Sequence, residues 1–371
     1  MHKVTFYPIG NAESVQIELD NGQKILFDYA NQGDPENSED LRIDLAKALR
    51  DDLRAAKRDS FDVVAFTHLD DDHIQGMSEF FHLEHAQKYQ GEGRIKIDIL
   101  WVPAAAIIET NCKDEAQILQ AEAKHRLRAG SGIRVFSRPK QLEDWLEDQG
   151  LTIDDRKDLI TDAGECPPEF TLDEQEIEFF VHSPFAHRLD DGTILDRNID
   201  ALVVQARFVY NSVMTQLVLT ADLPHEAMAE MIDVTRHYGN DDRLEWDIID
   251  VPHHCSYLSL AAEKGEEKTE PVPQLKWLYE EQAQDKGILV SSSKPIPTND
   301  GDKQPPHRQA ANYYKDCAAS IGGEFIVTME HPKKRAPEPL VITIDDSKAT
   351  SKKSTVSTVG IVSSRPSYRV G

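Results

Sequence analysis

Cysteines are few and long apolar runs are missing from this chain. The four cysteines, at positions 112, 166, 255 and 317, are far apart and form no CxxC pair, which favours free thiols in a reducing cytoplasm over a disulfide framework. No apolar run approaches the roughly 20 residues that span a bilayer. The first residues enter a strand-like pattern directly, so we expect no signal peptide, no membrane association and a cytoplasmic location.

Positive charge is also scarce. The 371 residues carry a formal net charge of −25, and the segment 347–371 contains five basic residues and no acid, which leaves −30 on the rest. Nucleic-acid binders usually show a basic footprint. A body this acidic repels long phosphate backbones unless metal ions or local Lys/Arg clusters offset its field. There is also no internal repeat and no glycine-rich phosphate loop.

The stretch 67–76 carries the strongest functional signal. It follows an apolar, β-branched run, which predicts a strand that ends in a loop of imidazoles and carboxylates. Alternate residues of an extended segment point the same way, so His68, Asp70 and Asp72 can converge on one side. A turn can direct Asp72 and His73 toward a second point. Two imidazoles and two carboxylates this close are typical of a site for two adjacent divalent metal ions, whereas an isolated cluster would more often be a solvated loop.

Later strand-like runs also end on possible ligands, which are His182, Asp222 and the pair His253 and His254. One such ending means little, but several in one chain favour a common site, and either histidine of the pair would complete it. An earlier strand ends at Asp28, which either caps a turn or positions a metal ligand from behind. Strands that alternate with helical patterns predict a layered α/β fold.

Two segments stand apart from this pattern. Residues 104–165 are dominated by charged helical patterns, which we interpret as a helical insertion that acts as a lid, a partner surface or a purely structural element. Residues 347–371 are rich in Ser, Thr and Lys, a composition typical of a tail outside the core. We therefore expect one domain over residues 1–346 and a C-terminal tail over 347–371.

These motifs resemble the metallo-β-lactamase superfamily, and most of all the hydrolase domain of ComEC-like competence proteins. The segments that carry the resemblance are 9–14, 24–28, 68–73, 198–203, 219–223, 251–256 and 306–307. In that group an aspartate replaces the second histidine of the metal motif, as Asp70 does here. Cys255 stands where the group has glycine, and residues 104–165 have no assigned counterpart. The resemblance implies an αββα sandwich with the metal ions at one edge of its two sheets.

The expected ligands form two sets that share a bridging carboxylate. They are His68, Asp70 and His182 for one ion, Asp72, His73 and either His254 or His253 for the other, and Asp222 as the bridge. Two ions lower the pKa of a bridging water, and the resulting hydroxide attacks phosphorus or a carbonyl carbon. The aspartate ligand shifts the preference from Zn²⁺ toward Mn²⁺ or Mg²⁺, although Zn²⁺ still binds such sets.

Four further roles are expected near the metals. Asp72 also orients the nucleophile. His307, which opens a helical pattern after two prolines, protonates a leaving oxygen, binds the substrate or merely begins a helix. Ser256 and Asn198 contact the substrate.

The resemblance favours a phosphodiesterase or nuclease. Since the body is so acidic, a small phosphodiester or a short single strand fits better than a long polyanion. The alternatives are hydrolysis of another ester or amide, or a non-catalytic, metal-stabilised interaction module whose insertion or tail recruits protein partners in a multi-protein system such as bacterial defence.

Overall fold

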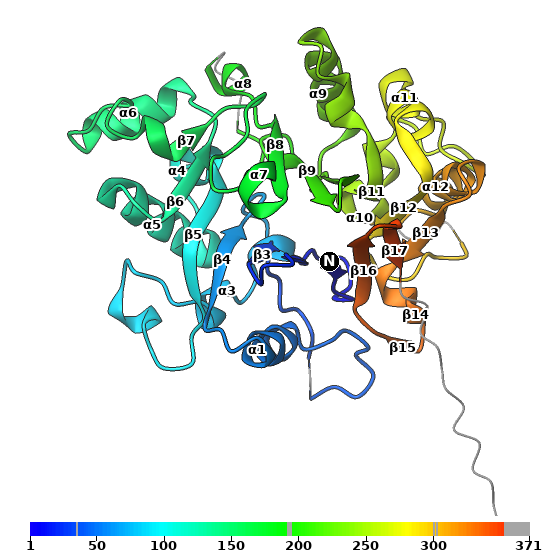
Figure 1. The fold of residues 1–371 in the computed structure, drawn as a ribbon, viewed down its shortest axis with the longest axis horizontal. Helices are drawn as coiled ribbons and strands as arrows, with labels where there is room; N and C mark the ends of the chain where they lie inside the picture. Colours follow the sequence, from blue (N-terminus) through cyan, green and yellow to red (C-terminus); the bar gives the residue numbers. More distant parts are fainter. Residues whose placement is uncertain (35, 191–194, 300, 302, 352–371) are drawn as a thin grey trace, which may run out of the picture.

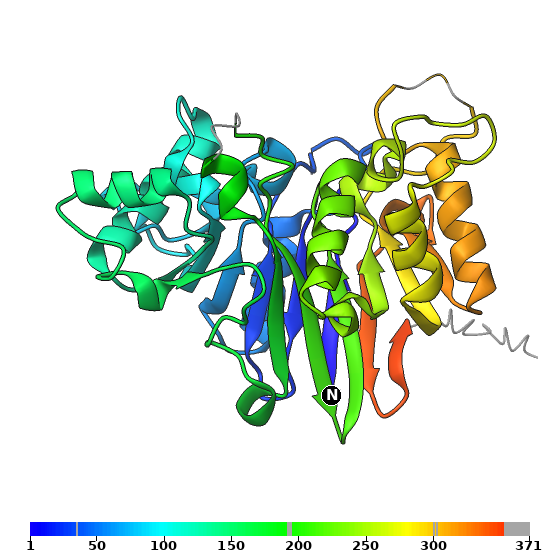
Figure 2. The same ribbon diagram turned by 90° about the horizontal axis from the view of Figure 1, so that it is seen from above.

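Two β-sheets pack face to face in the computed structural model, which describes residues 1–34, 36–190, 195–299, 301 and 303–351. Helices cover the outer face of each sheet, so the strands lie between two groups of helices (Figure 1). The same separation of the two groups is visible from above (Figure 2). The predicted αββα sandwich is therefore confirmed. No helix in the described ranges is long and apolar enough to cross a membrane.

The first sheet has nine strands within the described residues, in the order β17-β16-β1-β2-β3-β4-β5-β6-β7. Their bounds are β1 (His2–Phe6), β2 (Val15–Glu18), β3 (Lys24–Phe27), β4 (Ser60–Ala65), β5 (Lys96–Pro103), β6 (Ile133–Phe136), β7 (Ile160–Thr161), β16 (Leu340–Asp345) and β17 (Lys348–Ser351). Strands β3 to β7 run parallel to one another, while β1, β2, β16 and β17 pair antiparallel. The carboxyl ends of β3 and β4 consequently lie at the same edge.

The second sheet has six strands in the described part of the chain, in the order β13-β12-β11-β10-β9-β8. They are β8 (Ile177–Ser183), β9 (Val203–Tyr210), β10 (Val213–Leu219), β11 (Trp246–Asp250), β12 (Ala283–Ser291) and β13 (Glu324–Val327), and a separate pair is formed by β14 (Pro332–Lys333) and β15 (Ala336–Pro337). Strands β10 to β13 run parallel, so the carboxyl ends of β10 and β11 also share one edge.

The helices divide between the two outer layers and the connecting loops. The α-helices are α1 (Leu45–Ala55), α2 (Asp71–Ile74), α3 (Met77–Phe80), α4 (Ala105–Ile108), α5 (Asp114–Ala129), α6 (Lys140–Asp148), α7 (Leu172–Gln175), α8 (Ala186–Asp190), α9 (His225–His237), α10 (Pro252–Cys255), α11 (Pro273–Glu281) and α12 (Arg308–Ser320). Short 3-10 turns are η1 (Gln87–Tyr89), η2 (Lys157–Leu159), η3 (Asp241–Leu244), η4 (Tyr257–Ser259) and η5 (Thr328–Glu330).

The core forms three apolar layers. Between the sheets, Trp101 is fully buried, and its ring centroid lies 5.3 Å from that of Phe179 and 6.4 Å from that of Phe27. On the outer face of the first sheet, α1 buries leucines four residues apart at positions 45, 49 and 53, the spacing that places side chains on one helical face. Helices α9, α11 and α12 cover the outer face of the second sheet in the same way.

The segment 104–165 differs from the prediction. It contains helices α4, α5 and α6, but it also contributes β6 and β7, which continue the parallel part of the first sheet beyond β5. The segment is therefore not helical throughout, because the two short strands are integral to the sheet. Lys348 to Ser351, the first part of the predicted tail, form β17, which pairs with β16; the remainder, 352–371, lies outside the described residues.

Candidate metal centre

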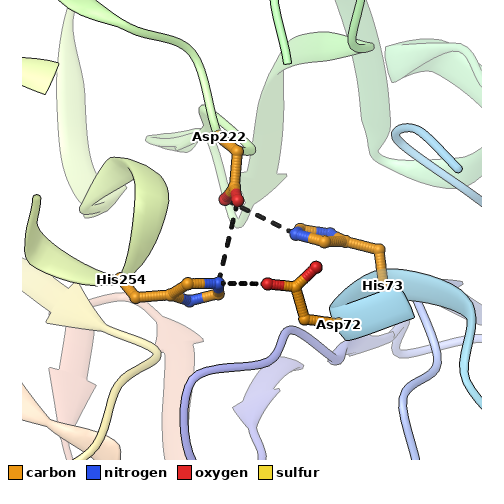
Figure 3. A group of neighbouring side chains, drawn as sticks. All are labelled: Asp72, His73, Asp222 and His254. Carbon is orange, nitrogen blue, oxygen red and sulfur yellow. Dashed lines mark hydrogen bonds and ion pairs between the residues drawn. The ribbon is translucent and has the colours of Figure 1, made fainter. Parts of the chain in front are cut away.

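Four side chains from both sheets converge at one edge of the sandwich. Asp72 and His73 lie on α2 after β4, Asp222 follows β10, and His254 follows β11. Figure 3 shows them pointing toward a common centre, and one ligand atom from each lies within 4.8 Å of the others. The convergence follows from the topology, because the carboxyl ends of neighbouring parallel strands meet at one edge of a sheet.

His73 is held from behind by Asp28. Its Nδ1 lies 2.8 Å from Asp28 Oδ2, and the same carboxylate accepts hydrogen bonds of 2.7 Å from the backbone N–H and the hydroxyl of Thr67. The Nε2 atom is buried, has no hydrogen-bond partner within the described residues, and faces Asp222 Oδ1 at 3.4 Å. Burial lowers the pKa of His73, but Asp28 and Asp222 outweigh it and raise this pKa well above its ordinary value.

His254 is oriented by the backbone on one side and by carboxylates on the other. Its Nδ1 donates to the carbonyl of Ser292 at 2.8 Å, so Nε2 remains for a ligand and lies 3.1 Å from Asp72 Oδ2. Residues 253, 254 and 255 all take positive φ, at 48°, 53° and 66°. Such angles cost non-glycine residues about 1–3 kcal/mol each. Cys255 thus adopts a conformation that favours glycine.

Asp222 faces two different histidines. Oδ1 lies 3.4 Å from His73 Nε2, and Oδ2 lies 3.7 Å from His254 Nε2. Burial raises the pKa of Asp222, but His254 and His73 outweigh it and hold this pKa well below the ordinary value. Asp222 thus presents both carboxylate oxygens to the histidines of the convergent group.

His68 and Asp70 lie beside this group. The His68 ring centroid is 4.0 Å from that of His73, and its buried Nε2 has no hydrogen-bond partner in the described part of the chain. That atom lies 3.6 Å from Asp70 Oδ2. Burial, assisted by the charge of His73, lowers the pKa of His68 to about 3. A neutral imidazole with an unpartnered buried nitrogen is suited to a metal ion.

The donor set fits divalent cations. Imidazole nitrogens at positions 68, 73 and 254 and carboxylates at positions 72 and 222 are the ligand types of Zn²⁺ and Mn²⁺ sites. Two of the histidines are oriented through their second ring nitrogen, by Asp28 and by the Ser292 carbonyl, as is usual for metal ligands. The unpartnered Nε2 atoms would otherwise remain unsatisfied in a buried site, which is costly.

Arg197 links this loop to the segment 104–165. Its guanidinium donates to the Leu69 carbonyl at 2.7 Å and to Asp70 Oδ1 at 2.9 Å, and it donates to both oxygens of Glu109. Asp70 is therefore held through one oxygen while the other faces His68. Arg197 was not singled out from the sequence, because its partners are 88 and 127 residues away.

Two further carboxyl groups lie behind the centre. Glu13 and Asp250 are almost fully buried. Neither carboxyl oxygen of Asp250 has a hydrogen-bond partner within the described residues, and the Glu13 backbone N–H donates to the Asp72 carbonyl at 3.0 Å. Burial raises the pKa of both carboxyl groups, and their mutual repulsion raises that of Asp250 further. The available sequence signal was position alone, since Glu13 lies within the segment 9–14 and Asp250 directly precedes the segment 251–256, both of which carry the family resemblance.

The structure separates His182 and His253 from the convergent group. His182 Nε2 lies 2.9 Å from the Arg243 carbonyl and Nδ1 lies 3.1 Å from the Thr235 hydroxyl, so both ring nitrogens are occupied by protein groups. The prediction of His182 as a ligand is corrected: on β8 it points toward α9, away from the inter-sheet face. His253 is half-buried, and His254 is the member of the pair that joins the group.

The remaining predicted residues lie around the same loops. The backbone N–H of His307 donates to the Cys255 carbonyl at 3.0 Å, and the His307 ring contacts Tyr257. Ser256 is buried, and its Oγ accepts from the N–H of Leu258 and caps η4. Asn198 lies in the loop before β9, and its Oδ1 is buried without a hydrogen-bond partner in the described residues. Their roles toward a substrate remain predictions.

Comparisons with known proteins give structural likenesses at low sequence identity. No family model matches the chain, and no curated protein matches it. Among solved structures it is similar to a diphosphatase of the PhnP family (10% identity, 93% of this chain and 98% of that chain, TM-score 0.36) and to unliganded yeast PDE1 (10%, 88% and 96%, 0.42). It is also similar to the metallo-β-lactamase GOB-18 from Elizabethkingia meningoseptica (13%, 73% and 83%, 0.30). Functional conclusions therefore rest on the side chains of the site.

Proposed function

We propose that this protein is a metal-dependent hydrolase that binds two divalent ions and acts on phosphodiesters. The observation that carries the proposal is the convergence of Asp72, His73, Asp222 and His254, beside which the buried Nε2 atoms of His68 and His73 have no hydrogen-bond partner within the described residues. Divalent ions in such a site make water nucleophilic near neutral pH and stabilise developing negative charge.

The charge of the site supports cations as its occupants. Six carboxyl groups lie at or beside the centre, and within the described residues only that of Asp70 pairs with a Lys or Arg; the other five are Glu13, Asp28, Asp72, Asp222 and Asp250. Burial raises the pKa of Glu13, Asp28 and Asp250, because buried carboxylates are strongly unfavourable. Two divalent ions would offset most of this charge.

We assign the ligands as follows. His68 and Asp70 would hold one ion, Asp72, His73 and His254 the other, and Asp222 would contribute one oxygen to each. Asp72, which is about one third exposed, would also orient the attacking water by accepting a hydrogen bond from it. The excess of carboxylate ligands favours Mn²⁺ or Mg²⁺ relative to an all-histidine site.

A phosphodiester is the favoured substrate because of the sequence resemblance, and the acidity of the chain favours a small or single-stranded one. Hydrolysis of another ester or amide is the alternative. Metal-stripped protein should be inactive and should regain activity with Mn²⁺ or Zn²⁺. The screen would include bis(p-nitrophenyl) phosphate, single- and double-stranded DNA, RNA and cyclic nucleotides.

Paired variants make this test specific. Asp72→Ala should abolish hydrolysis and reduce bound metal, whereas His182→Gln, a change at a buried histidine outside the group, should retain both. The proposal would be refuted if no ion restored hydrolysis of any of these substrates. It would also be refuted if His182→Gln lost bound metal while Asp72→Ala kept it.

A further inference from the structure

A cationic hollow lies at the opposite end of β4 from the metal centre. It has a volume of about 650 Å³, and its lining includes the C-terminal part of α1, the start of β5 and the loop before it. Its basic residues come from these three elements and from the turn that follows α1, and they are Arg50, Arg54, Lys57, Arg58, Arg94 and Lys96. Asp59 and Glu92 also line it, so the cations exceed the acids by four in a protein whose net charge is −25.

Part of this positive charge is not neutralised by neighbouring carboxylates. Arg54, Arg58 and Lys96 pair with aspartates at 2.6–2.8 Å. Arg50 instead stacks over the Phe80 ring, with its guanidinium carbon 4.6 Å from the ring centroid. Neither Arg50 nor Lys57 has a carboxylate partner within the described residues. The hollow therefore presents uncompensated cations to solvent.

Lys57 occupies a position where glycine would fit better. It follows the last turn of α1 with φ of 56°, and the next N–H, of Arg58, donates back to the Leu53 carbonyl at 2.9 Å. This arrangement usually has glycine at the left-handed residue. The negative end of the α1 dipole explains cations at positions 54, 57 and 58. Arg94 donates to the backbone carbonyls of Ser78 and Phe81, and Lys96 pairs with Asp59. Neither the dipole nor a carboxylate accounts for Arg50 in the same hollow.

We propose that this hollow is a binding site for the phosphate groups of a ligand. Several guanidinium and ammonium groups around one concavity are the usual means of binding phosphate. Strand β4 has six residues and spans about 20 Å at 3.3 Å per residue. Because β4 is mostly buried, a single strand that reaches both sites over the surface needs more than roughly six nucleotides at 3.4 Å each. The phosphate groups can therefore belong to a free polyphosphate or to a strand that also reaches the metal centre, and only the second source rests on the proposed function.

The test measures binding by the full-length, metal-loaded protein. The probes are a fluorescent phosphorothioate oligothymidylate of about twelve nucleotides, chosen to exceed the six-nucleotide span and to resist hydrolysis, and inorganic triphosphate. The variant combines Lys57→Gln with Lys96→Gln. The matched control combines Lys268→Gln with Lys276→Gln, which removes the same charge from two ion pairs elsewhere.

Binding of at least one probe should weaken about fivefold or more in the variant and stay unchanged in the control. For the oligonucleotide, the slope of log K against log salt should fall by about 1.4, because each lost contact to a single strand contributes about 0.7. An effect on the oligonucleotide identifies a nucleic-acid strand as the source, and an effect on triphosphate alone identifies a free polyphosphate.

Equal binding by wild type, variant and control, or no binding of either probe, would overturn the proposal. Lys57→Gly provides a check that does not depend on a folding defect: it should raise the melting temperature, because glycine tolerates positive φ, and still weaken phosphate binding. Variant-dependent binding without any hydrolysis would support this phosphate site and contradict the proposed function. Hydrolysis without variant-dependent binding would support the proposed function and contradict this site.

Discussion

Asp28→Asn isolates the support that orients His73. Asp28 is fully buried, and its Oδ1 accepts from the Thr67 N–H while its Oδ2 accepts from the Thr67 hydroxyl and His73 Nδ1. If the amide oxygen of Asn keeps the hydrogen bond from the Thr67 N–H, the amide NH₂ faces His73 Nδ1. That nitrogen must then accept a hydrogen bond and cannot carry a proton. The imidazole proton moves to Nε2 and blocks the ligand position. If the amide flips, two N–H groups face each other at Thr67.

The magnitude follows from these contacts. Loss of the supporting group of a metal-bound histidine typically lowers metal affinity by about 10–100-fold, or about 1.4–2.7 kcal/mol. A buried hydrogen bond to a charged group contributes about 1.5–3 kcal/mol to folding. We therefore expect Asp28→Asn to weaken Mn²⁺ or Zn²⁺ binding by one to two orders of magnitude, and the metal-free variant to lose about 2 kcal/mol of unfolding free energy.

The assay combines calorimetric metal titration with denaturant unfolding of the metal-free protein. Asp62→Asn is the matched control, because Asp62 also accepts from a backbone N–H, that of Lys24 at 2.7 Å, and pairs with Arg58, but lies away from the centre. It should lose stability and keep metal affinity. A folded Asp28→Asn variant that binds metal within about twofold of wild type would refute the reasoning, because a tenfold loss is the smallest effect expected.

Three further predictions test the site and the core. Arg197→Lys should weaken metal binding about tenfold, measured by titration, because lysine cannot hold Glu109 and Asp70 together; unchanged affinity would contradict this. Burial lowers the pKa of His182 to about 4, so the unfolded protein binds the extra proton and stability should fall by about 3 kcal/mol as pH drops from 6.5 to 4. His182→Gln should flatten that part of the unfolding profile, and an equally steep profile would count against the assignment. Trp101→Ala should cost about 3–5 kcal/mol. Trp101→Phe should cost less, because the buried indole N–H has no partner within the described residues; equal losses in denaturant unfolding would contradict this.

The convergent residues were predictable because their signals are local. Asp72, Asp222 and His254 each follow an apolar run that forms a buried strand, and the end of such a run is visible in sequence. His182 shows the limit of this reasoning. It also lies near the end of an apolar run, but side chains alternate along a strand. Val181 belongs to the core between the sheets, so His182 points to the opposite face, toward α9. The sequence showed the strand end and not its orientation.

Contacts between distant segments were not predictable in this way. β6 and β7 are short and follow charged helical segments, so their pairing with the sheet depends on β5 beside them. Glu13 and Asp250 each appear as an ordinary acid near a strand end, and only their mutual burial marks them as part of the site. Periodicity identifies the elements, whereas packing decides which polar side chains share an interior.

The two sheets contribute complementary halves of the centre. The first sheet supplies His68, Asp70, Asp72 and His73, and the second supplies Asp222 and His254. In the proposed assignment neither half holds all the ligands of two ions, so the complete set exists only when the sheets are packed against each other. Metal binding would therefore be thermodynamically linked to packing of the sheets, because a ligand that binds only the assembled state stabilises that state. The strained backbone at residues 253–255 is placed where this added stability can offset its cost.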